Sequence, residues 1–230
     1  MICSVLIIFA TPAYKKRTRL TDFAPFCALS EAKGMDISMK NGLFTGTGGR
    51  TIIPAVRQPE DLGAACLSDW PVLFLLTGNL FTVEDYVKQA DSAGKKVFLH
   101  VDFLAGLGND SVAVEYIADR VRPTGIISTK SHMVKQAKKC GLQAIQRLFL
   151  IDTSALEHGI HTVRQNRPDA LEIMPGLIPR VISELRASTS LPIIAGGLIK
   201  KHEEIETALR AGAAAVSMGN KSLWHSFANS

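Results

Sequence analysis

The sequence predicts an α/β fold, namely a (βα)8 TIM-like barrel with an abbreviated last helix and an irregular N-terminal extension. Eight short apolar runs recur between Ile52 and Met218, and each is closed by glycine, proline or a charged residue. A stretch with helical spacing follows nearly every run. The last two runs end in the glycine pair Gly196-Gly197 and in Gly219, an arrangement typical of barrels that bind phosphate after their last two strands.

Strands are expected where the apolar runs show little alternation, because the strands of a parallel sheet are covered on both faces. Strand and helix alternate throughout, which favours a parallel sheet with crossover helices. On these criteria the eight predicted strands are Thr51–Val56, Val72–Leu76, Val97–Val101, Gly125–Ser128, Ala144–Leu150, Ala170–Ile173, Pro192–Ala195 and Ala214–Ser217.

The segments between the strands place apolar residues on one helical face, as at Val83, Val87 and Ala90. After the eighth predicted strand, only residues 220–226 remain to form a helix. The eighth helix is therefore expected to be abbreviated, which leaves that side of the barrel for the N-terminal segment to cover.

The chain is expected to hold one barrel domain, residues 42–230, preceded by an extension, residues 1–41. Much of the extension shows no sustained period of two or 3.6 residues, so no packed element is predicted there. Two interpretations remain open. The extension is either genuine, or a result of a misassigned start, with translation beginning at Met35 or Met39 instead of Met1.

Composition indicates a globular protein, since 47% of the residues are hydrophobic and 20% are charged. The four cysteines are scattered, without a Cys-x-x-Cys pair or a histidine at metal-site spacing, so we expect reduced thiols and assign no metal ligands. Whether a metal takes part at another site is left open. The apolar stretch 2–10 is too short to span a bilayer and precedes its basic residues, the reverse of a secretory signal. A cytoplasmic protein without a membrane partner is expected.

The formal net charge of +5 gives only weak support for nucleic-acid binding by the barrel. Residues 1–41 hold six Lys or Arg and three acidic residues, which leaves +2 for the remainder. A local basic stretch at Lys135, Lys138 and Lys139 suits contact with RNA phosphates, although a solvated helix face is its more usual meaning.

Chemistry in a βα barrel is carried by residues at the carboxyl ends of the strands. Lys130 and Arg147 are placed there, and they supply positive charge either to an anionic ligand or to ion pairs within the barrel mouth. Asp102 and Glu172, also at strand ends, are expected to accept hydrogen bonds from ligand hydroxyls. The same positional criterion selects Arg57, Thr77, Gly78, Ser128, Thr129, Asp152 and Lys221.

Backbone amides at Gly196, Gly197 and Gly219 are expected to approach a phosphate closely, and a helix beginning near Asn220 would add its positive end. The alternative is that these glycines only permit tight turns. His100 is expected to share one side of the third strand with Asp102, where it suits metal binding or proton transfer, with a core role preferred.

Eight segments in fixed order carry a family resemblance. They are Ile52–Arg57, Lys95–Asp102, Gly106–Gly108, Gly125–Lys130, Gln146–Asp152, Glu172–Gly176, Pro192–Ile199 and Asn220–Trp224. Together they resemble the glycerol-3-phosphate-responsive antiterminators of bacterial glycerol uptake operons. The similarity runs from Arg50 to about Trp224 and leaves residues 1–41 outside.

The resemblance implies a regulator without catalytic residues or a cofactor. Such a protein binds the effector glycerol 3-phosphate and the leader mRNA of a glycerol-metabolism operon, where it prevents termination. By matching motif, the implied phosphate cradle is Gly196, Gly197, Gly219 and Asn220. The other implied ligand groups are Asp102, Lys130, Arg147 and Glu172. The sequence Ser217-Met218-Gly219 departs from the Ser- or Thr-rich version expected in relatives, which leaves Ser217 and backbone amides for phosphate contacts.

The alternative is a barrel enzyme that acts on a small sugar or glycerol phosphate. Asp102, Lys130 or Glu172 would then serve as acid, base or imine-forming group. Composition and spacing do not separate these two hypotheses, and only the resemblance favours the regulator. The RNA-binding surface and the oligomeric state, a homo-oligomer included, also stay open.

Overall fold

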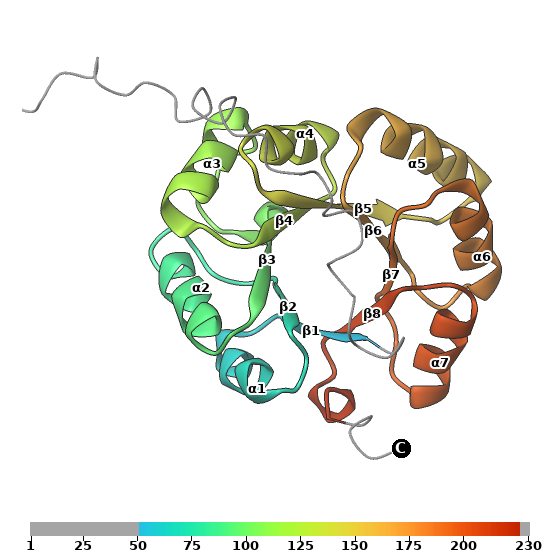
Figure 1. Cartoon of the computed structure of the whole chain (residues 1–230), viewed down its shortest axis with the longest axis horizontal. Coiled ribbons are helices and arrows are strands. Elements are labelled where there is room, and N and C mark those ends of the chain that lie inside the picture. Colours follow the sequence, from blue (N-terminus) through green and yellow to red (C-terminus); the bar gives the residue numbers. More distant parts are fainter. Residues whose placement is uncertain (1–50, 226–230) are drawn as a thin grey trace, which may run out of the picture. The chain divides into compact units, whose positions relative to one another are not determined.

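In the computed structural model, which describes residues 51–225, eight parallel strands close into a barrel in chain order (Figure 1). β8 pairs with β1, so the sheet has no free edge. The strands are β1 (Ile52–Val56), β2 (Val72–Leu75), β3 (Lys96–His100), β4 (Gly125–Ser128), β5 (Gln143–Phe149), β6 (Ala170–Met174), β7 (Ile193–Gly196) and β8 (Ala215–Met218). The predicted barrel is confirmed, and every predicted strand agrees with the observed one to within one residue at each end.

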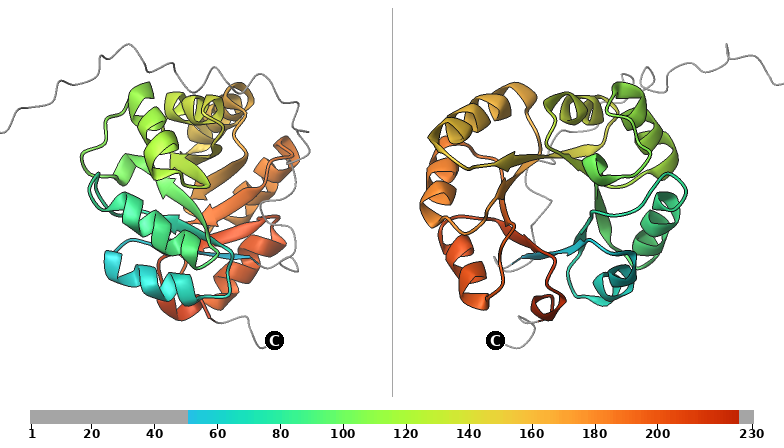
Figure 2. Two further views of the ribbon diagram at one scale, coloured as in Figure 1. Left: turned by 60° about the vertical axis from the view of Figure 1, so that its left-hand side comes forward. Right: turned by 180° about the vertical axis from the view of Figure 1, so that it is seen from behind.

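Seven α-helices in the described part of the chain form an outer ring around the strands (Figure 2). They are α1 (Leu62–Leu67), α2 (Val83–Ser92), α3 (Ser111–Tyr116), α4 (Ser131–Lys139), α5 (Thr153–Asn166), α6 (Pro179–Ser188) and α7 (His202–Arg210). A π-helical segment, Ile117–Val121, directly continues α3. Among residues 51–225, no helix is long and apolar enough to cross a membrane.

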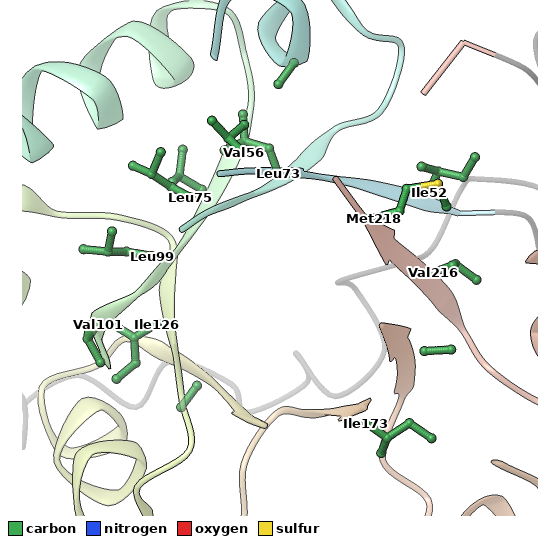
Figure 3. Packing of buried hydrophobic residues seen from close by; sticks show 14 of the residues in the cluster. Ile52, Val56, Leu73, Leu75, Leu99, Val101, Ile126, Ile173, Val216 and Met218 are labelled. Carbon is green, nitrogen blue, oxygen red and sulfur yellow. The ribbon is translucent and has the colours of Figure 1, made fainter. Parts of the chain in front are cut away.

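The strands are apolar on both faces because they separate two cores. One cluster fills the barrel interior and includes Phe74 and Phe98, whose rings meet edge to face at a centroid distance of 6.1 Å. The other cluster lies between the strands and the helices, and Figure 3 shows its side chains pointing away from the barrel axis. This double burial explains why the apolar runs of the sequence hardly alternate.

The eighth helix is abbreviated, as predicted, to a single 3₁₀ turn, Lys221–Leu223. Next to it the fully buried Trp224 donates from Nε1 to the carbonyl of Met218 at 2.9 Å. Trp70 donates from its Nε1 to the carbonyl of Trp224 at 2.6 Å. Two indoles therefore fasten the end of β8 to the segment between α1 and β2. Coverage of this side by the N-terminal segment concerns residues outside the described range, as do the proposed domain boundary at residue 41 and the three start sites.

We expect Trp224→Ala to lower the free energy of unfolding by about 3–5 kcal/mol, because it leaves a large cavity and frees the carbonyl of Met218. Urea unfolding measures the change. Leu67→Ala serves as control, because that side chain is 85% exposed, and its effect should stay within about 0.5 kcal/mol. Equal stability of the two variants would contradict the role given to the indole.

Candidate functional site

A layer of buried polar side chains lies above the apolar interior, at the carboxyl ends of the strands. Its members are His100 on β3, Arg147 on β5, Glu172 on β6 and Ser217 on β8. Each stands two residues after an apolar residue of the inner cluster, so the alternation of the strand turns its side chain into the barrel. Those apolar residues are Phe98, Ile145, Ala170 and Ala215.

Arg147 and Glu172 form an ion pair at the centre of this layer. The guanidinium donates from Nε to Oε2 of Glu172 at 2.7 Å, and the hydroxyl of Ser217 donates to Oε1 at 2.6 Å. Both charged side chains are at most 3% exposed. Of the two partners predicted for Arg147, an anionic ligand or an acidic residue of the barrel mouth, the structure shows the acidic residue. Arg147 Nη2 has no partner among the described residues.

Gly196 is required by this ion pair. A Cβ atom on Gly196 would lie 2.5 Å from the hydroxyl of Ser217 and 2.8 Å from Oε1 of Glu172. The residue must therefore lack a side chain so that the serine can reach the carboxylate. Close packing is thus a third reason for a glycine at position 196, beside the phosphate cradle and the tight turn that the sequence left open.

Gly197 and Gly219 lie on the loops that follow β7 and β8. Gly197 has φ +76°, a backbone conformation that disfavours every side chain. Gly219 lies beside Arg57, since its Cβ position would be 3.3 Å from Arg57 Cδ. Among residues 51–225, the amides of Gly197 and Gly219 have no hydrogen-bond acceptor. These amides are thus available to an anion at this edge of the mouth.

Side chains of the protein already accept hydrogen bonds from backbone amides at the two helix starts near these loops. Glu204 accepts hydrogen bonds from the amides of Lys200 at 2.7 Å and Lys201 at 3.0 Å, and the Lys200 bond is the main cause that lowers the pKa of Glu204. Asn220 accepts with its own side chain from the amide of Ser222 at 3.2 Å. A helix does begin after Asn220, but it is a single 3₁₀ turn, and Asn220 itself caps one of its amides.

The expected alternation of His100 and Asp102 along one strand is wrong. β3 ends at His100, and Asp102 lies in the 3₁₀ turn Val101–Phe103. Its carboxylate accepts from the hydroxyl of Ser128 at 2.7 Å and from the amide and hydroxyl of Thr129 at 2.7 and 2.8 Å. Burial opposes ionisation of Asp102, but these hydrogen bonds lower its pKa overall. Asp102 thus ties the loop after β3 to β4.

Lys130 lies beside Asp102, with its Nζ 3.9 Å from the carboxylate, and it also donates to the side chain of Asn109. Both predicted cations, Lys130 and Arg147, therefore form ion pairs within the barrel mouth. Lys130 nevertheless keeps about a third of its side chain exposed, which allows it to approach a ligand in the mouth.

His100 is 1% exposed, and neither ring nitrogen has a partner among the described residues. Its ring packs against Phe103, with a centroid distance of 4.3 Å and an angle of 34°. Burial, and then the charge of Arg147, lower its pKa to about 3, so the imidazole is neutral near pH 7. His100 Nδ1 and Nε2 and Arg147 Nη2 are thus polar atoms that a ligand in the mouth would satisfy.

The structure also places the three lysines that were predicted to contact RNA phosphates. Lys135, Lys138 and Lys139 lie on α4, and its C-terminal half runs toward the opposite end of the barrel. Lys138 pairs with Asp169 at 2.5 Å, so the structure does not bring this stretch to the mouth.

Phe103 was not a candidate from the sequence, since its position beside His100 depends on the turn after β3. Among residues 51–225, no group of three or more metal-ligating side chains occurs.

We expect the burial of neutral His100 to make stability depend on pH. The pKa of His100 falls from 6.5 when unfolded to about 3 when folded, so the unfolded chain binds an extra proton between these values. The contribution is complete above pH 6.5 and is lost as the pH falls, by about 2 kcal/mol at pH 5. Urea unfolding at pH 7 and pH 5 measures it. His100→Gln should remove this difference, whereas the exposed His158→Gln should retain it. An unchanged difference in His100→Gln would refute this assignment.

Comparisons with known proteins agree with this architecture. The profile of the family described as "Glycerol-3-phosphate responsive antiterminator" matches residues 52–224. A glycerol uptake operon antiterminator regulatory protein from Listeria monocytogenes is 34% identical, with a TM-score of 0.73, over 83% of this chain and 98% of that one. A related Thermotoga maritima structure, a glycerol uptake operon antiterminator-related protein, is 30% identical with a TM-score of 0.68, over 76% and 98%.

One curated protein is similar in sequence over most of its length. The uncharacterized protein YgcP of Escherichia coli (strain K12) is 36% identical over 173 residues, which is 75% of this chain and 91% of YgcP. The family match covers all eight strands and each residue of the buried polar layer. The chain belongs to the glycerol-3-phosphate responsive antiterminator family.

Proposed function

We propose that the chain is a glycerol-3-phosphate-responsive transcription antiterminator. The effector binds in the barrel mouth, and the liganded protein binds the leader mRNA of a glycerol-metabolism operon and prevents termination. The observation that carries this proposal is the buried layer in which the ring nitrogens of His100 and Arg147 Nη2 have no partner within residues 51–225. The amides of Gly197 and Gly219, which have no acceptor in the same range, lie next to this layer. In a member of this family, such a site suits a small phosphorylated polyol.

The two ends of the effector suit two parts of the mouth. The phosphate lies at the loops after β7 and β8, where it accepts hydrogen bonds from the amides of Gly197 and Gly219 and meets the charge of the exposed Arg57. The glycerol hydroxyls lie over the polar layer, where they accept from Arg147 Nη2 and bond to His100. Glu172, Ser217 and Gly196 hold Arg147 in position beneath them.

Proton-transfer chemistry is poorly supported by the same groups, which favours a regulator over the barrel-enzyme alternative. Glu172 is saturated by Arg147 and Ser217, and Asp102 accepts three hydrogen bonds with a lowered pKa. His100 stays neutral far below pH 7. A general acid or base works best with a pKa near the operating pH, and neither His100 nor Asp102 offers one. The proposed function needs no cofactor, and its RNA partner implies a cytoplasmic protein.

Titration of the leader RNA with and without glycerol 3-phosphate tests the proposed function. A transcript of the leader upstream of the organism's own glycerol-metabolism genes is bound to the full chain, and fluorescence anisotropy reports the affinity. The effector should raise affinity about 5- to 150-fold, the usual range of coupling between two sites. Glycerol, inorganic phosphate and a leader without the inverted repeat are the controls. Identical binding curves at saturating effector would refute the coupling, and turnover of glycerol 3-phosphate would favour the enzyme.

We expect Gly219→Val to weaken effector binding, because its side chain would enter the space between the loop amide and Arg57. Gly219 lacks a positive φ, so the variant should fold, whereas valine at Gly197 would also strain the backbone. Calorimetry should show a loss of at least about tenfold in affinity for glycerol 3-phosphate, or about 1.4 kcal/mol. Gly63→Val is the matched control, since apart from its chain neighbours and the backbone of its own helix no atom lies within 4 Å of its Cβ position. Full affinity in Gly219→Val would move the phosphate elsewhere.

A further inference from the structure

Three phenylalanine rings are exposed on one side of the barrel mouth. Phe81 lies on the loop after β2 and is 93% exposed, Phe103 follows β3 and is 54% exposed, and Phe149 ends β5 and is 55% exposed. Apolar residues of this size are normally buried, and a group of them at one rim marks a surface that meets a partner. Within the described residues, these are all the phenylalanines with large exposure.

Contacts of neighbouring residues place the three phenylalanines on the same rim. The loops after β2 and β3 are joined by the amide of Leu80, which donates to the carbonyl of Ala105 at 3.3 Å, and by the reciprocal bond from Ala105 to Gly78 at 3.1 Å. The guanidinium carbon of Arg147 lies 5.8 Å from the centre of the Phe103 ring. Arg147 stands two residues before Phe149 on β5. The three rings therefore follow strands of one half of the barrel, in the order β2, β3 and β5.

Positive charge lies on the same rim. Arg57 is exposed after β1, and Lys130 is partly exposed after β4, between the positions of Phe103 and Phe149 in strand order. Aromatic faces interleaved with cations are the usual means by which proteins hold single-stranded nucleic acid, since the rings stack on bases and the cations meet phosphates. The aliphatic residues Ile151, Leu177 and Leu198 are exposed on the following loops and offer no face for stacking.

We propose that this mouth arc, formed by Arg57, Phe81, Phe103, Lys130 and Phe149, is the surface on which unpaired bases of the leader RNA stack. The inference rests on the proposed function and places its RNA partner at the mouth, away from the basic stretch of α4. RNA and effector then occupy the same end of the barrel.

Phe103 connects the arc to the proposed effector site. Its ring packs on His100, and the guanidinium of Arg147 lies over it, while more than half of the side chain is open to solvent. His100 and Arg147 are the members of the buried polar layer whose side chains have polar atoms without a partner among residues 51–225. An effector that bonds to His100 and Arg147 fixes the surface against which Phe103 rests. The ring is then held in the position at which a base stacks, so effector binding and RNA binding favour the same state.

Aromatic-to-aliphatic substitutions test the mouth arc in the full chain. Anisotropy titrations of the leader transcript are compared for wild type, Phe81→Leu, Phe103→Leu and Phe149→Leu at saturating glycerol 3-phosphate. Each variant should lose roughly 5- to 150-fold in affinity, the equivalent of one stacked base. Phe81→Tyr retains a ring and should bind within about threefold of wild type. Leu198→Ala and Leu67→Ala remove exposed aliphatic groups and should leave the affinity unchanged.

The role of Phe103 has a separate readout. The ratio of RNA affinities with and without the effector should stay at the wild-type value in Phe81→Leu and Phe149→Leu. It should fall toward one in Phe103→Leu. An undiminished ratio in Phe103→Leu would contradict the connection through His100.

The outcomes separate this inference from the proposed function. If wild type binds the leader and responds to the effector but all three leucine variants bind equally well, the mouth arc is wrong and the antiterminator function stands. If wild type does not bind the leader, both fail. Equal loss in Phe81→Leu and Phe81→Tyr, or loss in Leu198→Ala, would overturn stacking. Sedimentation provides the last check, because an oligomer that the leucine substitutions dissociate would identify the arc as a contact between copies of the chain.

Discussion

The buried ion pair between Arg147 and Glu172 is the interaction on which the site depends. Removing two charges from water is costly, and a buried pair is tolerated only when its geometry is good and further hydrogen bonds satisfy it. Here Arg147 donates to one oxygen of the Glu172 carboxylate and the hydroxyl of Ser217 donates to the other. Gly196 leaves the space that the serine contact needs. Residues from β5, β6, β7 and β8 thus meet at one point. The floor of the mouth is polar, electrically neutral and fixed by four strands.

The barrel itself could be predicted from the sequence because its signal is local. Strands buried on both faces appear as apolar runs, and each ends where glycine, proline or charge begins, so their bounds were correct to within one residue. The positional criterion also selected Arg147 and Glu172, since the order of residues along a strand decides which of them reach the carboxyl end. Ser217 entered only through the family resemblance.

The contacts of these residues could not be predicted, since they depend on distances between separate strands. Asp102 leaves its strand in a 3₁₀ turn and accepts from Ser128 and Thr129, although its spacing from His100 suggested a shared strand face. Asn220 caps its own short turn, and Gly196 on β7 is needed for packing around a carboxylate on the neighbouring strand β6. Phe103 gave no signal, because an aromatic residue after a strand acquires meaning only through its contact with a buried histidine.

The suppressed ionisation of His100 has a consequence for sensing. A regulator whose pocket contained a histidine titrating near neutrality would report acidity along with metabolite level. Burial beside a guanidinium moves that ionisation to about pH 3, far outside any physiological interval. In the proposed site, the contribution of His100 to effector binding would therefore not change with proton concentration between about pH 5 and pH 8.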